Sequence, residues 1–225
     1  MPNITDEPQK PVPLGTQLRN GVECFTGCLV YQDIVQNVEE QQSKPFYFEE
    51  NDARQKRPIM TSLPGKVPMQ AHTAEVLRQC VGAAVVPGGW VGGDAWFGSV
   101  MTCVELKKRL NVNSTFVVKG HTQFFPIAVL YSVLLARHGT RPAGHWVTMT
   151  TTISEVPVIA VAYAWSQKGV SYFVSTCGST ELSLIKYQSK FEDEWGNTNI
   201  WEIDRPQLAY FLYKYLLLID EHNKQ

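Results

Sequence analysis

The sequence predicts an α/β fold for this chain of 225 residues, on three observations. An apolar run begins at Trp90 and ends in two glycines and an acid. A helix-like segment and a second apolar run follow it, as in a strand–turn–helix–strand unit. The stretch from His145 to Cys177 is dense in β-branched and aromatic residues. Hydrophobic residues make up 44% of the chain, which is enough for a core. We expect one domain that carries an insertion.

The first third of the chain predicts little regular structure. Met1–Pro13 holds four prolines among polar residues, so we expect a flexible lead-in and structure from about Leu14. Residues Gly21–Val35 carry recurring β-formers broken by a glycine and predict a pair of adjacent strands. The polar stretch Glu39–Gln70 is interpreted as a surface excursion whose basic cluster is a solvated loop, with a phosphate contact as the alternative.

The remaining elements follow from spacing and punctuation. The apolar positions of His72–Val86 recur at helical offsets and stop before a Pro-Gly-Gly turn, which predicts a helix packed on a sheet. A second helix is predicted over Val100–Leu110 and a strand over Thr115–Val118. Proline at 206 marks a helix start and predicts a closing helix over Gln207–His222. The β-rich stretch predicts a small antiparallel meander of three strands, over His145–Ile153, Val156–Trp165 and Val170–Cys177.

Charge and cysteine content limit the classes of function. The net charge is -1 and the isoelectric point about 6.5, whereas a nucleic-acid binder usually has a basic surplus, so we expect this piece alone to bind DNA weakly. The odd number of cysteines, the lack of a secretory signal at Met1–Asp6 and the lack of a long apolar span favour a reduced intracellular location without membrane insertion. Cys24 and Cys28 lack the second half of a zinc site, so we interpret them as ordinary buried thiols, with a metal role as the alternative.

Several segments resemble piggyBac-type transposases. Gly93–Ser99, followed by a helix and Phe116–Gly120, looks like the second catalytic aspartate motif of that family, D-x-W-F-x-S. Val170–Cys177 resembles the strand before its last catalytic stretch, and Leu218–Asn223 resembles its terminal acidic helix motif. Lys10–Gly15 is similar to the stretch shortly after the family's first aspartate. The resemblance thus covers most of the chain.

The resemblance implies a ribonuclease-H-like core, incomplete at the N-terminus, formed by residues 1–120 and 206–225 and interrupted by a β-rich insertion over 121–205. It also implies DDD-type DNA cleavage and strand transfer in the nucleus, with DNA as partner and Mg²⁺ or Mn²⁺ as cofactor. Asp94 and Asp220 would be catalytic metal ligands, and Asn223 a weak neutral one. Two hard cations about 3.5–4 Å apart need several carboxylates, so one acid alone is insufficient.

One departure from the family bears on activity. The sequence opens after the position of the family's first aspartate, and Asp6 and Asp33 stand in a different local context. We therefore expect a transposase-derived chain that has lost catalysis. Two alternatives stay open: an active nuclease in which a substitute carboxylate completes the site, and a domesticated module that binds a protein partner.

Each candidate residue also has an ordinary structural interpretation. Asp94 precedes a helix and is of a type that caps backbone N–H groups. Asp220 is interpreted either as the inherited ligand or as a solvated acid paired with Lys214 or Lys224. Core packing is the favoured interpretation of an adjacent aromatic pair, with base stacking as the alternative. That pair is Trp96 and Phe97, and the histidines expected to play no metal role are His121, His138 and His145.

Overall fold

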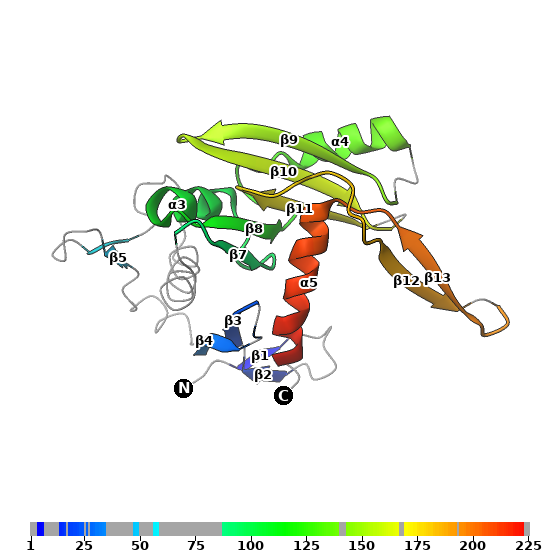
Figure 1. Ribbon diagram of the computed structural model, residues 1–225, viewed down its shortest axis with the longest axis horizontal. Coiled ribbons are helices and arrows are strands. Elements are labelled where there is room, and N and C mark those ends of the chain that lie inside the picture. Colours follow the sequence, from blue (N-terminus) through cyan, green and yellow to red (C-terminus); the bar gives the residue numbers. More distant parts are fainter. Residues whose placement is uncertain are drawn as a thin grey trace. The chain divides into compact units, whose positions relative to one another are not determined.

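The structure is a computed structural model (Figure 1) that describes residues 4–6, 14–16, 18–24, 26, 28–34, 47–49, 56–58, 87–139, 143–166, 169–192 and 194–222. The chain divides into two compact parts. One part comprises Met1–Val86 with Leu218–Gln225, and the other comprises Pro87–Leu217. Each part contains its own strands.

Three two-stranded antiparallel pairs make up the described strands of the first part. They are β1 (Ile4–Asp6) with β2 (Leu14–Thr16), β3 (Leu18–Val22) with β4 (Leu29–Ile34), and β5 (Tyr47–Glu49) with β6 (Lys56–Pro58). The strand pair predicted over Gly21–Val35 is confirmed as β3–β4, although β3 begins earlier, at Leu18. The expected onset near Leu14 is wrong, because β1 already pairs with β2 within the proposed lead-in. The helix predicted over residues 72–86 lies outside the described residues.

A five-stranded mixed sheet forms the centre of the second part, in the order β7-β8-β11-β10-β9. Its strands are β7 (Trp90–Gly93), β8 (Asn113–Val118), β9 (Trp146–Ile153), β10 (Val156–Ala164) and β11 (Val170–Ser175). β7 and β8 are parallel and are joined through α3 (Val100–Leu110), as the strand–helix–strand pattern predicts. The other neighbours are antiparallel, so the predicted meander is confirmed.

Helices cover both faces of this sheet (Figure 1). On one face, Leu208 and Leu212 of α5 (Gln207–His222) pack with Val161 and Phe173 in a buried cluster. Side chains alternate along a strand, so the neighbouring residues point to the opposite face, where they are also buried. There α3 contacts β8, β10 and β11, while α4 (Ile127–His138) contacts β9 and β10. The sheet is therefore the middle layer of an α/β/α arrangement.

In this second part, one helix and one two-stranded hairpin are not predicted from the sequence. The segment that forms α4 is apolar almost all round, so it shows no helical stripe, although it buries Leu130 and Leu134. β12 (Tyr187–Glu192) and β13 (Thr198–Ile203) form a hairpin that extends away from the sheet (Figure 1). No helix among the described residues combines the length and apolar character needed to span a bilayer.

The sheet crosses the boundary predicted at residue 120. β8 lies before that boundary and β11 after it, yet the two strands pair directly from Thr115 to Val118. The same sheet as β7 and β8 therefore contains β9, β10 and β11, whose residues were predicted to lie in the insertion. The chain forms a mixed α/β fold, and the ribonuclease-H-like core with its insertion stays a prediction.

Candidate functional site

The acid of the D-x-W-F-x-S block lies directly after β7. Gly93 is buried, and the next residue, Asp94, is exposed. The Asp94 Oδ1 atom accepts a hydrogen bond from the Trp96 backbone N–H at 2.9 Å, and the Phe97 N–H donates to the Asp94 carbonyl at 3.2 Å. Asp94 thus fixes a tight turn, as short acidic side chains commonly do. The Asp94 side chain therefore caps a backbone N–H of this turn, and it does not cap the helix that follows.

The helix after the turn begins at a different residue of the same block. Ser99 is the N-cap of α3, and its Oγ accepts a hydrogen bond from the Thr102 N–H at 3.0 Å. This bond satisfies one of the free N–H groups of the first turn. Between the turn and the cap, Gly98 lies against the carbonyl oxygen of Val117 so closely that a Cβ would overlap it. The block is therefore accounted for locally by an acid that holds a turn, a glycine at a close approach and a helix cap.

The two aromatic residues of the block contact each other. The rings of Trp96 and Phe97 meet edge to face with 4.9 Å between centroids, and both side chains are half-buried. The Phe97 Cβ also approaches Gly93, where an added Cβ would lie 3.3 Å away. This contact supports the packing interpretation of the pair.

A buried polar chain fastens the strands behind the turn. The Trp90 Nε1–H donates to Thr115 Oγ1 at 3.0 Å, and that hydroxyl lies 2.7 Å from the Ser175 hydroxyl. Ser175 in turn donates to the Ser114 carbonyl at 2.9 Å. Because Thr115 and Ser175 are buried, these bonds join β7, β8 and β11 in a water-excluded region. Asp94 therefore follows a strand that is held firmly in place.

The described residues supply one of the predicted metal ligands. Asp94 is exposed on its turn, whereas the backbone of Asp220 lies in α5, within the other compact part, and its side chain is outside the described residues. Asn223 and the side chains of Asp6 and Asp33 are outside them as well. Within the described ranges, no three His, Cys, Asp or Glu side chains gather as a metal-binding group. A two-cation site needs several carboxylates, and the pairing of Asp94 with Asp220 stays a prediction.

The cysteines differ in environment. Cys103 is fully buried on α3, and burial raises the pKa of its thiol to about 12. Burial also raises the pKa of Cys177. Cys28, by contrast, is exposed, so the expectation of a buried thiol is wrong for this residue. The Cys24 thiol is half-buried, and its pKa is raised by burial and by the neighbouring Glu23 carboxylate.

Two histidines from separate elements come together. The rings of His138, at the end of α4, and His145, just before β9, lie 4.1 Å apart between centroids. Burial, His145 and Arg137 lower the pKa of His138, because each disfavours its protonated form. Sequence spacing gives no sign of this pair, since residues 140–142 separate two different elements.

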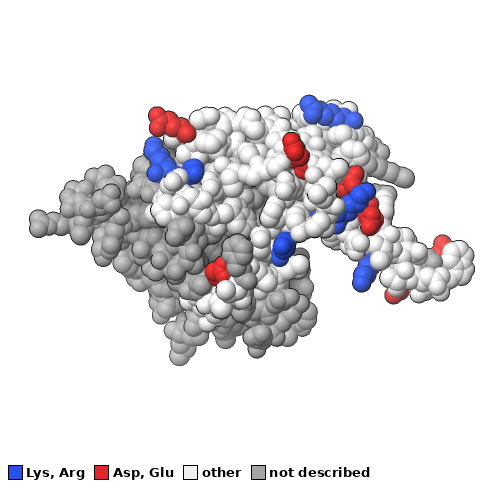
Figure 2. Space-filling view, in the orientation of Figure 1, with Lys and Arg blue, Asp and Glu red and all other residues white. Residues whose placement is uncertain are grey.

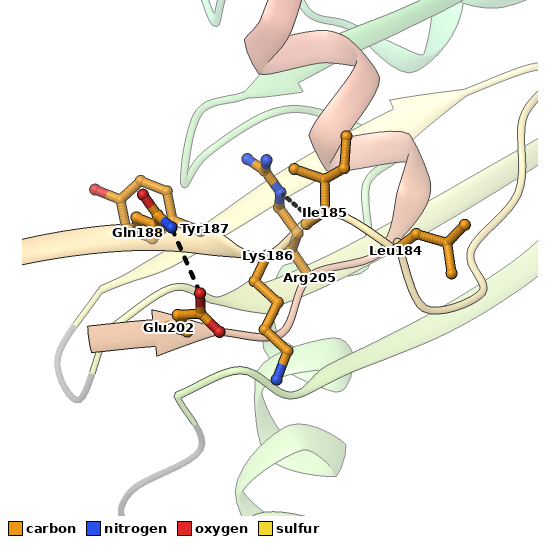
Figure 3. A pocket seen from close by; sticks show the side chains of 7 residues that line it. All are labelled: Leu184, Ile185, Lys186, Tyr187, Gln188, Glu202 and Arg205. Atoms are coloured by element: carbon orange, nitrogen blue, oxygen red, sulfur yellow. Dashed lines mark hydrogen bonds between the residues drawn. The ribbon is translucent and has the colours of Figure 1, made fainter. Parts of the chain in front are cut away.

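The base of the β12–β13 hairpin carries a pocket of about 530 Å³ (Figure 3). Its lining residues are Leu184, Ile185, Lys186, Tyr187, Gln188, Glu202 and Arg205. The Arg205 Nε–H donates to the Ile185 carbonyl at 3.0 Å, and Gln188 Nε2 donates to Glu202 Oε1 at 3.4 Å (Figure 3). The lining thus combines both charges with polar groups that already bond to one another, which indicates no particular ligand.

The same hairpin presents an aromatic face. Tyr187 pairs with Ile203, Ser189 with Trp201, and Phe191 with Asn199, so side-chain alternation places Tyr187, Phe191 and Trp201 on one side. Phe191 is 50% and Trp201 49% exposed. We call these three side chains the aromatic face of the hairpin. The opposite side carries mainly charged and amide groups.

Comparison with known proteins adds a likeness of fold. No protein-family model and no curated protein matches the chain. A solved structure does: the cryo-EM structure of a piggyBac transposase synaptic complex with hairpin DNA, at a TM-score of 0.57 and 15% sequence identity. The match covers 99% of this chain and 36% of that chain. This chain thus spans about a third of that transposase's length, and the likeness confirms the resemblance at the level of the fold.

Proposed function

We propose that this chain derives from a piggyBac-type DNA transposase and does not cleave DNA by itself. The carrying observation is the fold likeness over 99% of the chain, to which the D-x-W-F-x-S block adds a motif at the junction of β7 and α3. The same origin implies an intracellular, nuclear location and an ancestral affinity for DNA. Both belong to the proposal.

The loss of cleavage rests on the chemistry of phosphate transfer. Two hard cations must be held by several carboxylates if they are to activate the attacking oxygen and stabilise the leaving one. Asp94 contributes a single carboxylate, and one of its oxygens already accepts the Trp96 N–H. Within the described residues, no group of three ligands forms around it. In this proposal Asp94 holds the turn and no longer acts as a catalytic metal ligand.

A nicking assay tests this proposal. The chain is incubated with supercoiled plasmid and with a hairpin-ended duplex, in Mg²⁺ or Mn²⁺, beside its Asp94→Asn variant. We expect the same background for both proteins, because the amide keeps the turn and removes the charge. Nicking by the parent chain that disappears in the variant would overturn the loss of cleavage. Asp6→Asn and Asp33→Asn would then identify a substitute carboxylate.

The hairpin supports a second candidate function, that of a domesticated module that binds a protein. An isolated two-stranded hairpin has only marginal stability in water. This hairpin nevertheless exposes Phe191, Trp201 and, at its turn, Trp195, which is 82% exposed. Exposed aromatic side chains on one face are typical of a protein-binding surface. This function requires no DNA chemistry.

A matched pair of variants tests the module. Phe191→Ser with Trp201→Ser removes most of the aromatic face, while Gln188→Ser with Lys190→Ser changes the other side of β12. We expect a stoichiometric partner to be retained by the parent chain and the second variant and lost by the first, with no DNA retained at physiological salt. Equal retention by all three proteins would exclude the aromatic face as the binding surface.

A further inference from the structure

The outer edge of β9 offers a free row of backbone hydrogen-bonding groups. β9 is the last strand of the sheet, and in the described part of the chain its only partner is β10. All eight of its residues pair with β10 in continuous register, from Trp146 to Ile153. Every second N–H and C=O along it therefore points away from the sheet. Such an edge is a template for a further strand.

β9 lacks the features that usually protect an edge. Its sequence, WVTMTTTI, contains no charged residue and no proline, and its ladder contains no bulge. The five residues from Thr148 to Thr152 are all exposed. In Figure 2 the upper rim of the molecule, over β9 and α4, is uncharged between its two ends. The opposite edge strand, β7, has only four residues, two of them glycine.

We propose that two copies of this chain pair through β9, antiparallel, about a two-fold axis centred on Thr150. The axis stands perpendicular to the sheet, so the two five-stranded sheets join into one continuous sheet with their helices on matching sides. Thr148 lies opposite the partner's Thr152, and Met149 lies opposite the partner's Thr151. This is β-strand addition with the chain itself as the added strand.

The composition of β9 favours a second copy as the occupant. Antiparallel self-pairing meets no like charges along the strand, and it places threonines across from each other, a pair that stabilises sheets. The same centre brings the His145 end of one copy to the Glu155 end of the other, since both residues lie five positions from Thr150. The acid in the turn after β9 thus comes near a histidine at each end of the paired strands. Pairing of the two strands also covers Met149, which is 41% exposed in the single chain.

The seam, which is the pair of β9 strands from the two copies, is short, and its length limits the affinity of the dimer. Stable protein interfaces bury about 1,600 Å² in total, and one strand pair buries less. We expect a dissociation constant on the order of micromolar to tens of micromolar. Sedimentation-equilibrium runs of the whole chain from about one-tenth to ten times that range should show a monomer–dimer transition. A monomer at every concentration overturns the proposal.

Two double variants test the register. In Thr148→Lys with Thr152→Lys, each lysine meets a lysine of the partner, whereas in Thr148→Lys with Thr152→Glu each lysine meets a glutamate. The first should weaken the dimer about tenfold or more relative to the second, because the contact occurs twice. Both positions are exposed, and thermal melts of the two variants at low concentration check that both fold alike. Equal dimerisation of the two variants overturns the centred register.

Hydrogen exchange distinguishes this seam from dimerisation elsewhere. Amides of residues 148–152 that point away from β10 should become protected as the concentration rises through the transition, while those of β12 and β13 should not change. Concentration-dependent protection confined to the hairpin would assign the dimer to the aromatic face and overturn the proposal.

Discussion

Gly98 lies against the carbonyl oxygen of Val117, at a distance that leaves no room for a side chain. Gly98→Ala must therefore push the turn away from β8, and we expect a loss of about 1–3 kcal/mol in the free energy of unfolding, typical of overpacking. Urea titration measures it. Gly120→Ala is the control, because a Cβ there meets nothing within 4 Å. Equal effects of the two substitutions would contradict the close approach.

Ser99→Ala removes the N-cap of α3 and leaves the Thr102 N–H without its present acceptor. Such substitutions cost about 0.5–2 kcal/mol, so the midpoint of urea unfolding should fall. Ser132→Ala serves as the control, because that hydroxyl donates to the Ala128 carbonyl within α4 and caps nothing. If Ser99→Ala unfolds at the parent's urea concentration, the cap does not contribute.

Two substitutions of Asp94 separate its structural role from the effect of its charge. Asp94→Asn keeps an oxygen that accepts the Trp96 N–H, whereas Asp94→Ala removes it. We expect little change in unfolding free energy for the first and a loss of about 1 kcal/mol for the second. The comparison uses the same urea titration for both. A destabilised Asp94→Asn would indicate that the negative charge itself holds the turn.

The raised pKa of the Cys103 thiol predicts a loss of folding stability at alkaline pH. Its thiol has a pKa of about 12 in the folded chain against an ordinary value of 9.0. Between these values the unfolded chain loses the proton and the folded chain keeps it, so the contribution is complete below pH 9 and declines as the pH rises to about 12. Urea midpoints measured across that window should fall.

The Cys103→Ala variant identifies the contribution of this thiol. It should show a shallower decline over the same pH window, because the titrating group is gone, even if the cavity lowers its stability at neutral pH. A decline as steep as the parent's would assign the alkaline loss to other groups, such as Tyr163, whose pKa burial also raises.

Elements with a strong local signal were predictable from sequence. The helix over Val100–Leu110 has helical spacing between a serine cap and a left-handed Asn111, and the structure gives it the same bounds. The closing helix begins after Pro206 and also matches its predicted bounds. The three β-rich runs form the antiparallel meander. Each depends on local spacing or on pairing between strands that follow one another in the chain, which sequence patterns record.

Elements that depend on distant partners were not predictable. The stretch that becomes α4 has no polar stripe, so its helix is fixed by packing on β9 and β10. The 4.1 Å approach of His138 to His145 and the bond from Trp90 to Thr115 join separate elements. No spacing rule detects them.

By itself the sequence determined the alternation of strands and helices, the position of Asp94 at a strand end and the family resemblance, because these reside in local patterns and motifs. Only the tertiary structure decided that the β-rich meander joins β7 and β8 in one sheet, and that β9 is the last strand of this sheet in the described part of the chain. Strand order depends on which backbone groups find partners across the chain, and the pattern of side chains along a single strand does not record that choice.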